Sequence, residues 1–293
     1  MAVTTPAAPV LTSPHRSANT APSSNPMPPN IANAVLGNLH MKPWYPSFYP
    51  EDMIGGRKTD WLYVCQWCFK YTSEIMKFCG HCAQLYAQNL SLFSKLFLET
   101  KSVFFDASTF LYYTLVLRPE PTDPKSHGQV VGFFSKEKMS WDNNNVACIL
   151  VFPPWQRRGL GQILIAASYE LGKREERFGG PERPLSALGL KGYLAFWSGE
   201  VARWILGTQG KRSVGIKEIS DATWILPEDV VAALVQMDVM EKRKTASGNV
   251  VVSKGKVRAW ADKTGVRAAP LIDVDAFVEA EDVEYEDDED DDG

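Results

Sequence analysis

The sequence predicts an α+β fold, with a central, mostly antiparallel sheet and helices flanking it. Four short apolar runs, at 101–106, 109–117, 130–135 and 146–152, have the length of strands. Turn-forming residues at 119–128 and 142–145 separate these runs. Segments with helical periodicity follow, at 161–177 and about 191–206.

A smaller helical part is expected after the core. Ile216, Ile219 and Ala222 share one face of a helix, and Pro227 is suited to the first turn of a second. The apolar run 250–252 then has strand character. We expect a scaffold here rather than a DNA-reading surface, because the three basic residues at 242–244 are too few for a groove contact.

The two ends of the chain have compositions that oppose folding. Residues 1–33 are rich in Pro, Ser, Thr and Ala without apolar periodicity, and residues 279–292 hold eleven acidic side chains. We therefore expect five parts: a disordered tail at 1–33, an amino-terminal region at 34–92, a core at 93–210, the helical part at 211–270 and an acidic disordered tail at 271–293.

Charge and hydropathy limit the classes of protein to which the chain can belong. The net charge of −4 includes the acidic tail, so the rest of the chain is mildly basic. That balance suits contact with chromatin, although a tail that only solubilises the chain explains it equally well. Neither a secretory leader nor a run of ~20 apolar residues is found, and we expect a soluble, intracellular protein.

One hexapeptide, Gln156-Arg157-Arg158-Gly159-Leu160-Gly161, lies where a buried strand gives way to a helix. The first backbone N–H groups of a helix lack partners and carry the positive end of its dipole, so they bind anions. The arginines add charge. The segment lacks the third glycine of a dinucleotide fingerprint and the Gly-Lys-Ser/Thr of a P-loop. It predicts a phosphate-binding turn or, in the alternative, a tight turn with two exposed arginines.

Two residues near this turn are candidates for chemistry. Glu182 lies between Pro181 and Arg183-Pro184, where prolines limit the backbone and fix the direction of its side chain. Such a carboxylate serves as a general base, or else as a loop glutamate paired with Arg183. Cys148 stands in an apolar strand, where cysteine is either a small core residue or a nucleophile.

The other cysteines are grouped. Cys65, Cys68, Cys79 and Cys82 form C-x2-C-x10-C-x2-C, with His81 inside the second pair. Paired thiolates two residues apart grip one tetrahedral ion, so the spacing predicts a structural zinc site. Disulfides are disfavoured in a reducing compartment.

Several ordered motifs carry a resemblance to a known family. The hexapeptide looks like the acetyl-coenzyme A loop of GNAT-type acetyltransferases. More narrowly, the chain resembles the MYST family of histone acetyltransferases from about Leu36 to about Ser253, and most resembles its fungal silencing-associated branch. The matching stretches are 96–101, 131–138, 145–150, 168–175, 181–186 and 216–220.

The resemblance implies a GNAT-like core, a winged-helix-like carboxy-terminal part and a set of functional residues. Glu182 would be the general base, and Cys148 either an acetyl-carrying nucleophile or a packing neighbour. Lys101 matches the autoacetylated lysine. Ala187 and Ala195 depart from the usual aspartate and serine of the family. Acetyl-coenzyme A would be bound by Ile149, Leu150, Val151, Gln156, Arg157, Arg158, Gly159, Leu160, Gly161, Gln162 and Ser186.

The family comparison changes the interpretation of the metal site. Cys65, Cys68 and His81 match the first three ligands of the family's Cys-Cys-His-Cys finger, but Leu85 stands where the fourth ligand is expected. Two interpretations remain open. Either Cys82, with Cys79 as the alternative, completes a rewired zinc site, or a deletion has impaired the finger.

The resemblance implies a nuclear histone lysine acetyltransferase that acts on a histone tail, with H4 implied by the branch. The expected partners are that tail and subunits of a chromatin-modifying complex, with neither a membrane nor sequence-specific DNA. Two alternatives are a catalytically weak chromatin-binding or scaffolding protein and an acetyltransferase for non-histone proteins.

Overall fold

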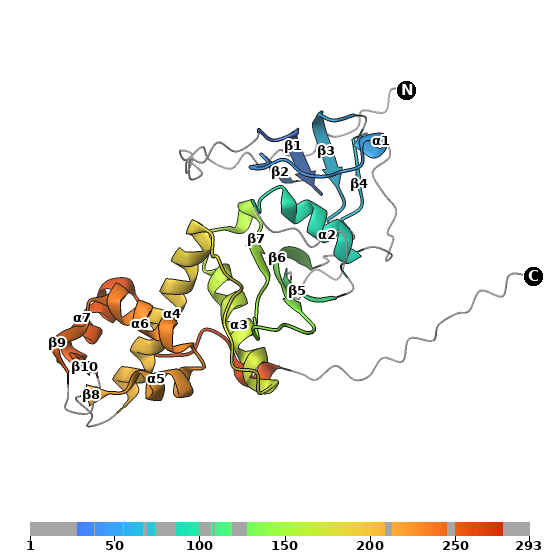
Figure 1. Cartoon of the computed structure of the whole chain (residues 1–293). Coiled ribbons are helices and arrows are strands. Elements are labelled where there is room, and N and C mark those ends of the chain that lie inside the picture. The colour runs from blue at the N-terminus through green and yellow to red at the C-terminus, as the bar shows by residue number, and fades with distance from the viewer. Residues whose placement is uncertain are drawn as a thin grey trace, which may run out of the picture.

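The computed structural model describes residues 28–277, apart from 38, 55, 67–68, 74–85, 100–106, 108, 119–127, 209–212 and 245–249. Over these residues the chain forms three small sheets and a series of helices, so the predicted α+β class is confirmed. Figure 1 shows the chain running from an amino-terminal sheet, through a central sheet and helix α3, to a carboxy-terminal group of helices. The predicted strand at 101–106 lies outside the described residues.

The amino-terminal sheet has the strand order β2-β1-β3-β4. Strand β1 pairs with β3 in parallel, and the other two pairings are antiparallel. Strand β1 begins within the segment 1–33 that we expected to be a disordered tail, because Ile31, Ala34 and Leu36 are fully buried. The elements of this part are β1 (Ile31–Leu36), β2 (Leu39–Met41), α1 (Glu51–Ile54), β3 (Thr59–Val64), β4 (Tyr71–Thr72) and α2 (Tyr86–Lys95).

The central sheet is antiparallel, with the order β5-β6-β7. Its strands are β5 (Phe110–Leu117), β6 (Gln129–Glu137) and β7 (Cys148–Val151). Strand β7 is shorter than the predicted run 146–152. Val146 instead forms an isolated bridge with Pro181, and Phe152 leads into a 3-10 turn over Pro153–Trp155.

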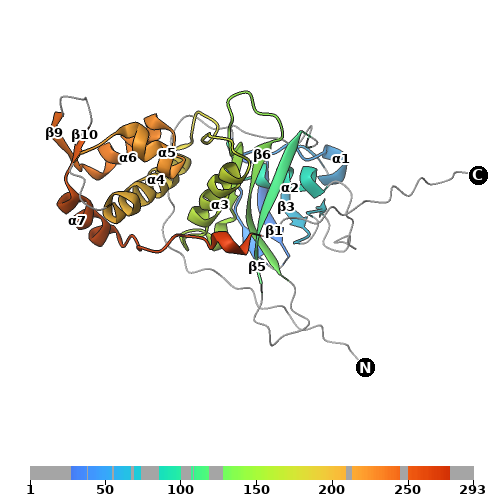
Figure 2. The same cartoon turned by 90° about the horizontal axis from the view of Figure 1, so that it is seen from below.

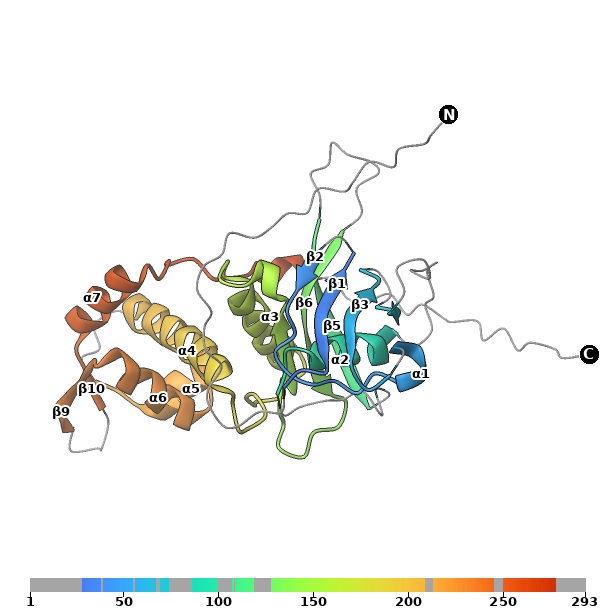
Figure 3. The same ribbon diagram turned by 90° about the horizontal axis from the view of Figure 1, so that it is seen from above.

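Two helices follow the central sheet, α3 (Leu160–Arg174) and α4 (Ala187–Gly207). Helix α3 lies between the sheet and α4, as Figures 2 and 3 show from opposite sides. Helix α4 begins about four residues before the predicted start, because the Ser186 hydroxyl caps it by accepting from Gly189 N.

The carboxy-terminal part contains β8 (Ser213–Val214), α5 (Ile216–Thr223), α6 (Pro227–Met237), β9 (Met240–Lys244), β10 (Val250–Val252), α7 (Lys254–Thr264) and a 3-10 turn at Val274–Ala276. The two helices predicted from Ile216 and Pro227 are confirmed, and Pro227 does occupy the first turn of α6. The three strands form an antiparallel sheet in the order β8-β10-β9.

Two large apolar clusters hold these parts together. The first joins the amino-terminal sheet, α2 and the central sheet, and at its centre Phe93 packs edge-on against Phe152 with ring centroids 5.1 Å apart. Phe69, from the turn after β3, contacts both rings. The second cluster joins α3 and α4 to the carboxy-terminal helices. Among the helices that the structure describes, none has the length and apolar character needed to cross a membrane.

Candidate active site

Cys148 is the first residue of β7 and is buried, with 5% of its surface exposed. It lies opposite Ser135 of β6, and its backbone N–H donates to the Ser135 hydroxyl at 3.2 Å. The preceding N–H, of Ala147, donates to the Ser135 carbonyl at 2.7 Å. The Cys148 N–H is therefore engaged by β6.

Glu182 is brought to the same strand by backbone pairing. Asn145 N donates to Gly180 O at 2.9 Å, Val146 bridges Pro181 in parallel, and Glu182 N donates to Val146 O at 2.8 Å. This pairing places Glu182, which is half-buried, beside the chain that runs into Cys148 two residues later. The two residues singled out for chemistry, distant in sequence, therefore lie on adjacent segments.

The Gln156–Gly161 loop forms the predicted junction between strand and helix. Gly159 caps α3 with a φ of +82°, a conformation that favours glycine, and Gln162 N donates to its carbonyl at 2.9 Å. Gln156 Nε2 donates to Val151 O at 2.8 Å and ties the loop back to β7. Arg157 and Arg158 are exposed, so the start of α3 presents backbone N–H groups beside two cations.

Two further residues expected to bind the cofactor have structural partners. The Gln162 side chain donates to Gly192 O at 2.9 Å and so links α3 to α4. The Ser186 hydroxyl accepts from Gly189 N at 3.1 Å as the cap of α4, which places Ser186 at the start of that helix.

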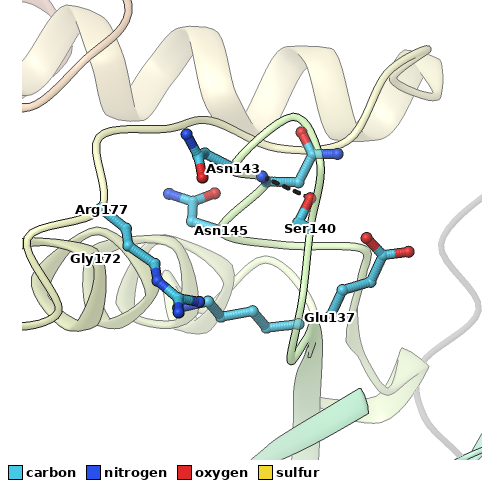
Figure 4. A pocket seen from close by; sticks show the side chains of 8 residues that line it. Glu137, Ser140, Asn143, Asn145, Gly172 and Arg177 are labelled. Atoms are coloured by element: carbon cyan, nitrogen blue, oxygen red, sulfur yellow. Dashed lines mark hydrogen bonds between the residues drawn. The ribbon is translucent and has the colours of Figure 1, made fainter. Parts of the chain in front are cut away.

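A small polar hollow lies beside the β6–β7 loop. Figure 4 shows Ser140, Asn143 and Asn145 of this loop at one side and Arg177 at the other. Its volume of about 10 Å³ is on the scale of one water molecule, far below that of a nucleotide cofactor. The Asn145 Oδ1 atom is buried here without a hydrogen-bond partner in the described structure.

Of the predicted metal ligands, the structure describes Cys65 alone; Cys68, Cys79, His81, Cys82 and the predicted autoacetylation site Lys101 lie outside the described residues. Cys65 is buried and begins a tight turn after β3. In this turn Phe69 N donates to Cys65 O and Cys65 N donates to Lys70 O, both at 2.9 Å.

Sequence reasoning missed two residues that shape the site. Ser135 holds the backbone at Cys148, and Asp229 of α6 binds Arg183, the neighbour of Glu182. Burial raises the pKa of Asp229, and the Arg183 guanidinium opposes that rise. An aspartate in the first turn of a helix and a serine in a strand are ordinary in sequence, so no local signal could have found either residue.

Comparison with known proteins identifies the family. Residues 69–276 match the model of the MOZ/SAS family, and residues 28–84 match the MYST family zinc finger domain. Because the first match covers well over half of the 293 residues, the chain belongs to the MOZ/SAS family, and the resemblance to MYST enzymes is confirmed.

Named relatives agree with this assignment. The chain is 35% identical over 280 residues to the Histone acetyltransferase Tip60 homolog of Caenorhabditis elegans, with 83% of this chain and 59% of the relative covered. It is 34% identical over 277 residues to the Histone acetyltransferase of the MYST family 1 of Arabidopsis thaliana, with 85% and 60% covered. Against the Histone acetyltransferase ESA1 of Gibberella zeae it is 33% identical over 275 residues, with 83% and 52% covered. The chain therefore spans between about half and three fifths of these relatives.

Proposed function

We propose that the protein is a lysine acetyltransferase that moves an acetyl group from acetyl-coenzyme A to a histone tail. The observation that carries this proposal is the backbone pairing that sets Glu182 beside the strand leading to Cys148, within the MOZ/SAS match. The relatives named histone acetyltransferases supply the substrate class.

The proposed chemistry begins with a proton. A lysine side chain titrates near ~10.4 and must lose a proton before its nitrogen can attack. The Glu182 carboxylate takes that proton, and the neutral amine then adds to the thioester carbonyl. The Ile149 N–H is our candidate donor to the oxygen that becomes negative. The intermediate then collapses to the amide as the carbon–sulfur bond breaks, and the departing coenzyme A thiolate takes up the second amine proton.

Cys148 has two possible roles in this scheme. As a nucleophile it would carry the acetyl group and need its thiolate, which a neighbouring base must generate. As a packing neighbour it would only shape the wall next to the thioester, which its 5% exposure also supports. Cys148→Ala separates these roles, since only the covalent route needs the sulfur and accumulates an acetylated enzyme.

Acetyl-coenzyme A is assigned to the start of α3. Its pyrophosphate would lie against the N–H groups of residues 159–161, with Arg157 and Arg158 contributing charge. Val151 of β7 lies next to this place, since its Cγ2 is 3.9 Å from a Cβ built on Gly161. Ile149, Leu150 and the α4 cap Ser186 are proposed to complete the site. Two observations support this fit: the left-handed Gly159 that opens the first turn of α3, and the exposure of both arginines.

Zinc is proposed as a structural ion of the amino-terminal finger. The match of residues 28–84 to the MYST finger and the turn that begins at Cys65 support this assignment. Cys65, Cys68, His81 and Cys82 would be its ligands, with Cys79 as the alternative. We expect about one zinc per chain, and Cys65→Ser should lower both zinc content and melting temperature, because structural zinc supplies roughly 10 kcal/mol in small fingers. A metal-free chain with an unchanged melting temperature contradicts the assignment.

The carboxy-terminal part is proposed to be winged-helix-like. Two consecutive helices, α5 and α6, are followed by two strands, and β8 completes their sheet in the order β8-β10-β9. We assign it a scaffolding role beside the active site. The domain limits predicted from the sequence remain part of this proposal, except that strand β1 begins at Ile31, within the predicted tail 1–33.

A nuclear location, a preference for histone H4 and membership of a chromatin-modifying complex complete the proposal. The test is to incubate the full chain with labelled acetyl-coenzyme A and core histones, and to quantify zinc in the same sample. We expect label on histone lysines, with most on H4. Equal labelling of unrelated lysine-rich proteins would favour a non-histone acetyltransferase, and tight histone binding without transfer would favour a scaffold.

A further inference from the structure

Asp229 is a buried acid at the start of α6, next to the segment that carries Glu182. It is 2% exposed, and its Oδ1 accepts from Arg183 Nη2. Its second oxygen, Oδ2, is buried and has no hydrogen-bond partner within the described structure. A buried carboxylate with one unsatisfied oxygen is an unfavourable choice for stability alone. Its position therefore calls for a functional explanation.

The Asp229 carboxylate reaches both ends of the segment 180–183. A Cβ placed on Gly180 would lie 3.5 Å from Asp229 Oδ2 and 2.9 Å from Leu226 Cδ1, so the start of α6 packs directly against this glycine. Three residues later the same carboxylate binds the Arg183 guanidinium. Glu182 lies between these two contacts.

The Arg183 side chain is also held by α4. Its guanidinium carbon lies 5.8 Å from the ring centroid of Trp197, within the range of a cation–π contact. Trp197 is fully buried, and its Nε1 donates to Tyr169 OH of α3 at 2.7 Å. The arginine is thus anchored to α6 and α4, and through Trp197 to α3.

The opposite edge of the segment is held by backbone bonds to residues 145 and 146, as described above. The segment therefore lies between the chain that leads into β7 and α6. Fixing Arg183 against α6 therefore restrains the backbone on both sides of it, and with it the position of the neighbouring Glu182.

We propose that Asp229 is a positioning residue for the general base: by binding Arg183 it sets the direction in which the Glu182 carboxylate meets the lysine substrate. This inference rests on the proposed acetyl transfer. Asp229 itself does not touch the reacting atoms. Because a misplacement of ~1 Å can lower a rate by about 100-fold, its loss reduces turnover and leaves binding at the α3 loop intact.

The experiment compares Asp229→Asn with Glu228→Gln in the full chain, using labelled acetyl-coenzyme A and a histone H4 tail peptide. Glu228 is the exposed neighbour of Asp229 on the same helical turn, so its substitution removes the same charge without touching Arg183. We expect Asp229→Asn to lower kcat by about 10- to 100-fold and to leave KM for acetyl-coenzyme A unchanged. Glu228→Gln should match the wild type in both constants.

Arg183→Gln provides the second arm, and its half-exposed side chain makes loss of the fold less of a risk. If the two residues act as one unit, the double variant is no slower than the slower single variant. Three results would overturn the positioning role. They are an unchanged kcat in Asp229→Asn, an equal loss of kcat in Asp229→Asn and Glu228→Gln, and additive losses of kcat in the double variant. A wild-type chain without acetyl transfer overturns the proposed function as well, whereas an active wild type with an unaffected Asp229→Asn overturns the positioning role alone.

Discussion

The Gln156–Gly161 loop and the segment 180–183 carry the two halves of the proposed reaction, and they are held in different ways. The loop is fixed by near neighbours in sequence, through Gln156 to Val151 and through Gln162 to Gly159. The segment is fixed by distant residues, with residues 145 and 146 before β7 on one edge and Asp229 of α6 on the other. Changes in the loop should therefore alter cofactor binding, and changes around the segment should alter turnover.

The sharpest way to test this division is to remove the base. Glu182→Gln should lower kcat by about 10²- to 10⁴-fold, the usual contribution of a general base, with KM for acetyl-coenzyme A unchanged. The measurement is steady-state transfer of label to a histone tail peptide. Glu176→Gln, which neutralises an exposed glutamate on the loop after α3, is the matched control and should behave as wild type. Wild-type turnover in Glu182→Gln would remove the carboxylate from the mechanism.

Gly179→Ala tests whether the segment depends on close packing of the preceding loop. A Cβ at this position would lie 1.8 Å from the Asn143 carbonyl oxygen, a distance that the backbone must relieve by moving. We expect a fall in kcat together with a loss of about 1–3 kcal/mol of unfolding free energy, as overpacking typically costs. Urea unfolding and peptide acetylation on one preparation measure both. A variant with native stability and turnover would show that the loop can move without consequence.

The loop side of the comparison is tested by a pair of glycine substitutions. Gly161→Ala meets no atom nearer than Val151 Cγ2 at 3.9 Å, and alanine favours a helix over glycine by roughly 0.5–1 kcal/mol. We expect a stable protein with a raised KM for acetyl-coenzyme A and a preserved kcat, because the added methyl occupies the approach of the pyrophosphate.

Gly159→Ala supplies the contrast, since its φ of +82° costs an L residue about 1–2 kcal/mol. This variant should lose both stability and cofactor affinity. Thermal melting with and without acetyl-coenzyme A distinguishes the two variants. Unaltered cofactor affinity in Gly161→Ala would place the pyrophosphate elsewhere.

The smallest expected effect is a pH dependence of stability that comes from Asp229. Burial raises its folded pKa above 3.8, Glu228 adds to the rise and Arg183 opposes it. Tyr169 and Tyr193 face it from α3 and α4. The Asp229 carboxyl group therefore keeps its proton to a higher pH in the folded state than in the unfolded state. Its contribution to the unfolding free energy is fully present below pH 3.8 and is lost as the pH rises through the raised pKa. As the pH rises above 3.8, the unfolding free energy of the wild type should therefore fall relative to that of Asp229→Asn. A difference between the two that stays constant with pH would contradict this.

The same comparison explains what could be predicted from the sequence. The junction before α3 could be predicted because its features are local in the sequence: an apolar strand is followed by two prolines, and then by glycines before residues with helical periodicity. The early start of α4 was missed although Ser186 is a normal cap, because Ala187 and Leu188 carry no periodic signal before the long apolar face begins.

The parts that escaped prediction depend on tertiary contacts. Strand β1 pairs in parallel with β3 across a long connection, and its six residues lack strict alternation. Similarly, only the fold shows that Ser135 and Asp229 meet Cys148 and Arg183. Glu182 and Cys148 were singled out by family motifs, and what the structure adds is the backbone pairing that brings their segments together.

The most direct test of the account is a single titration of the full chain with acetyl-coenzyme A, in which binding and acetyl-lysine formation on a histone H4 tail peptide are measured in the same sample. The account predicts saturable cofactor binding, with acetyl-lysine formed at a rate that follows the bound fraction. A folded chain that binds acetyl-coenzyme A and forms no acetyl-lysine would contradict it.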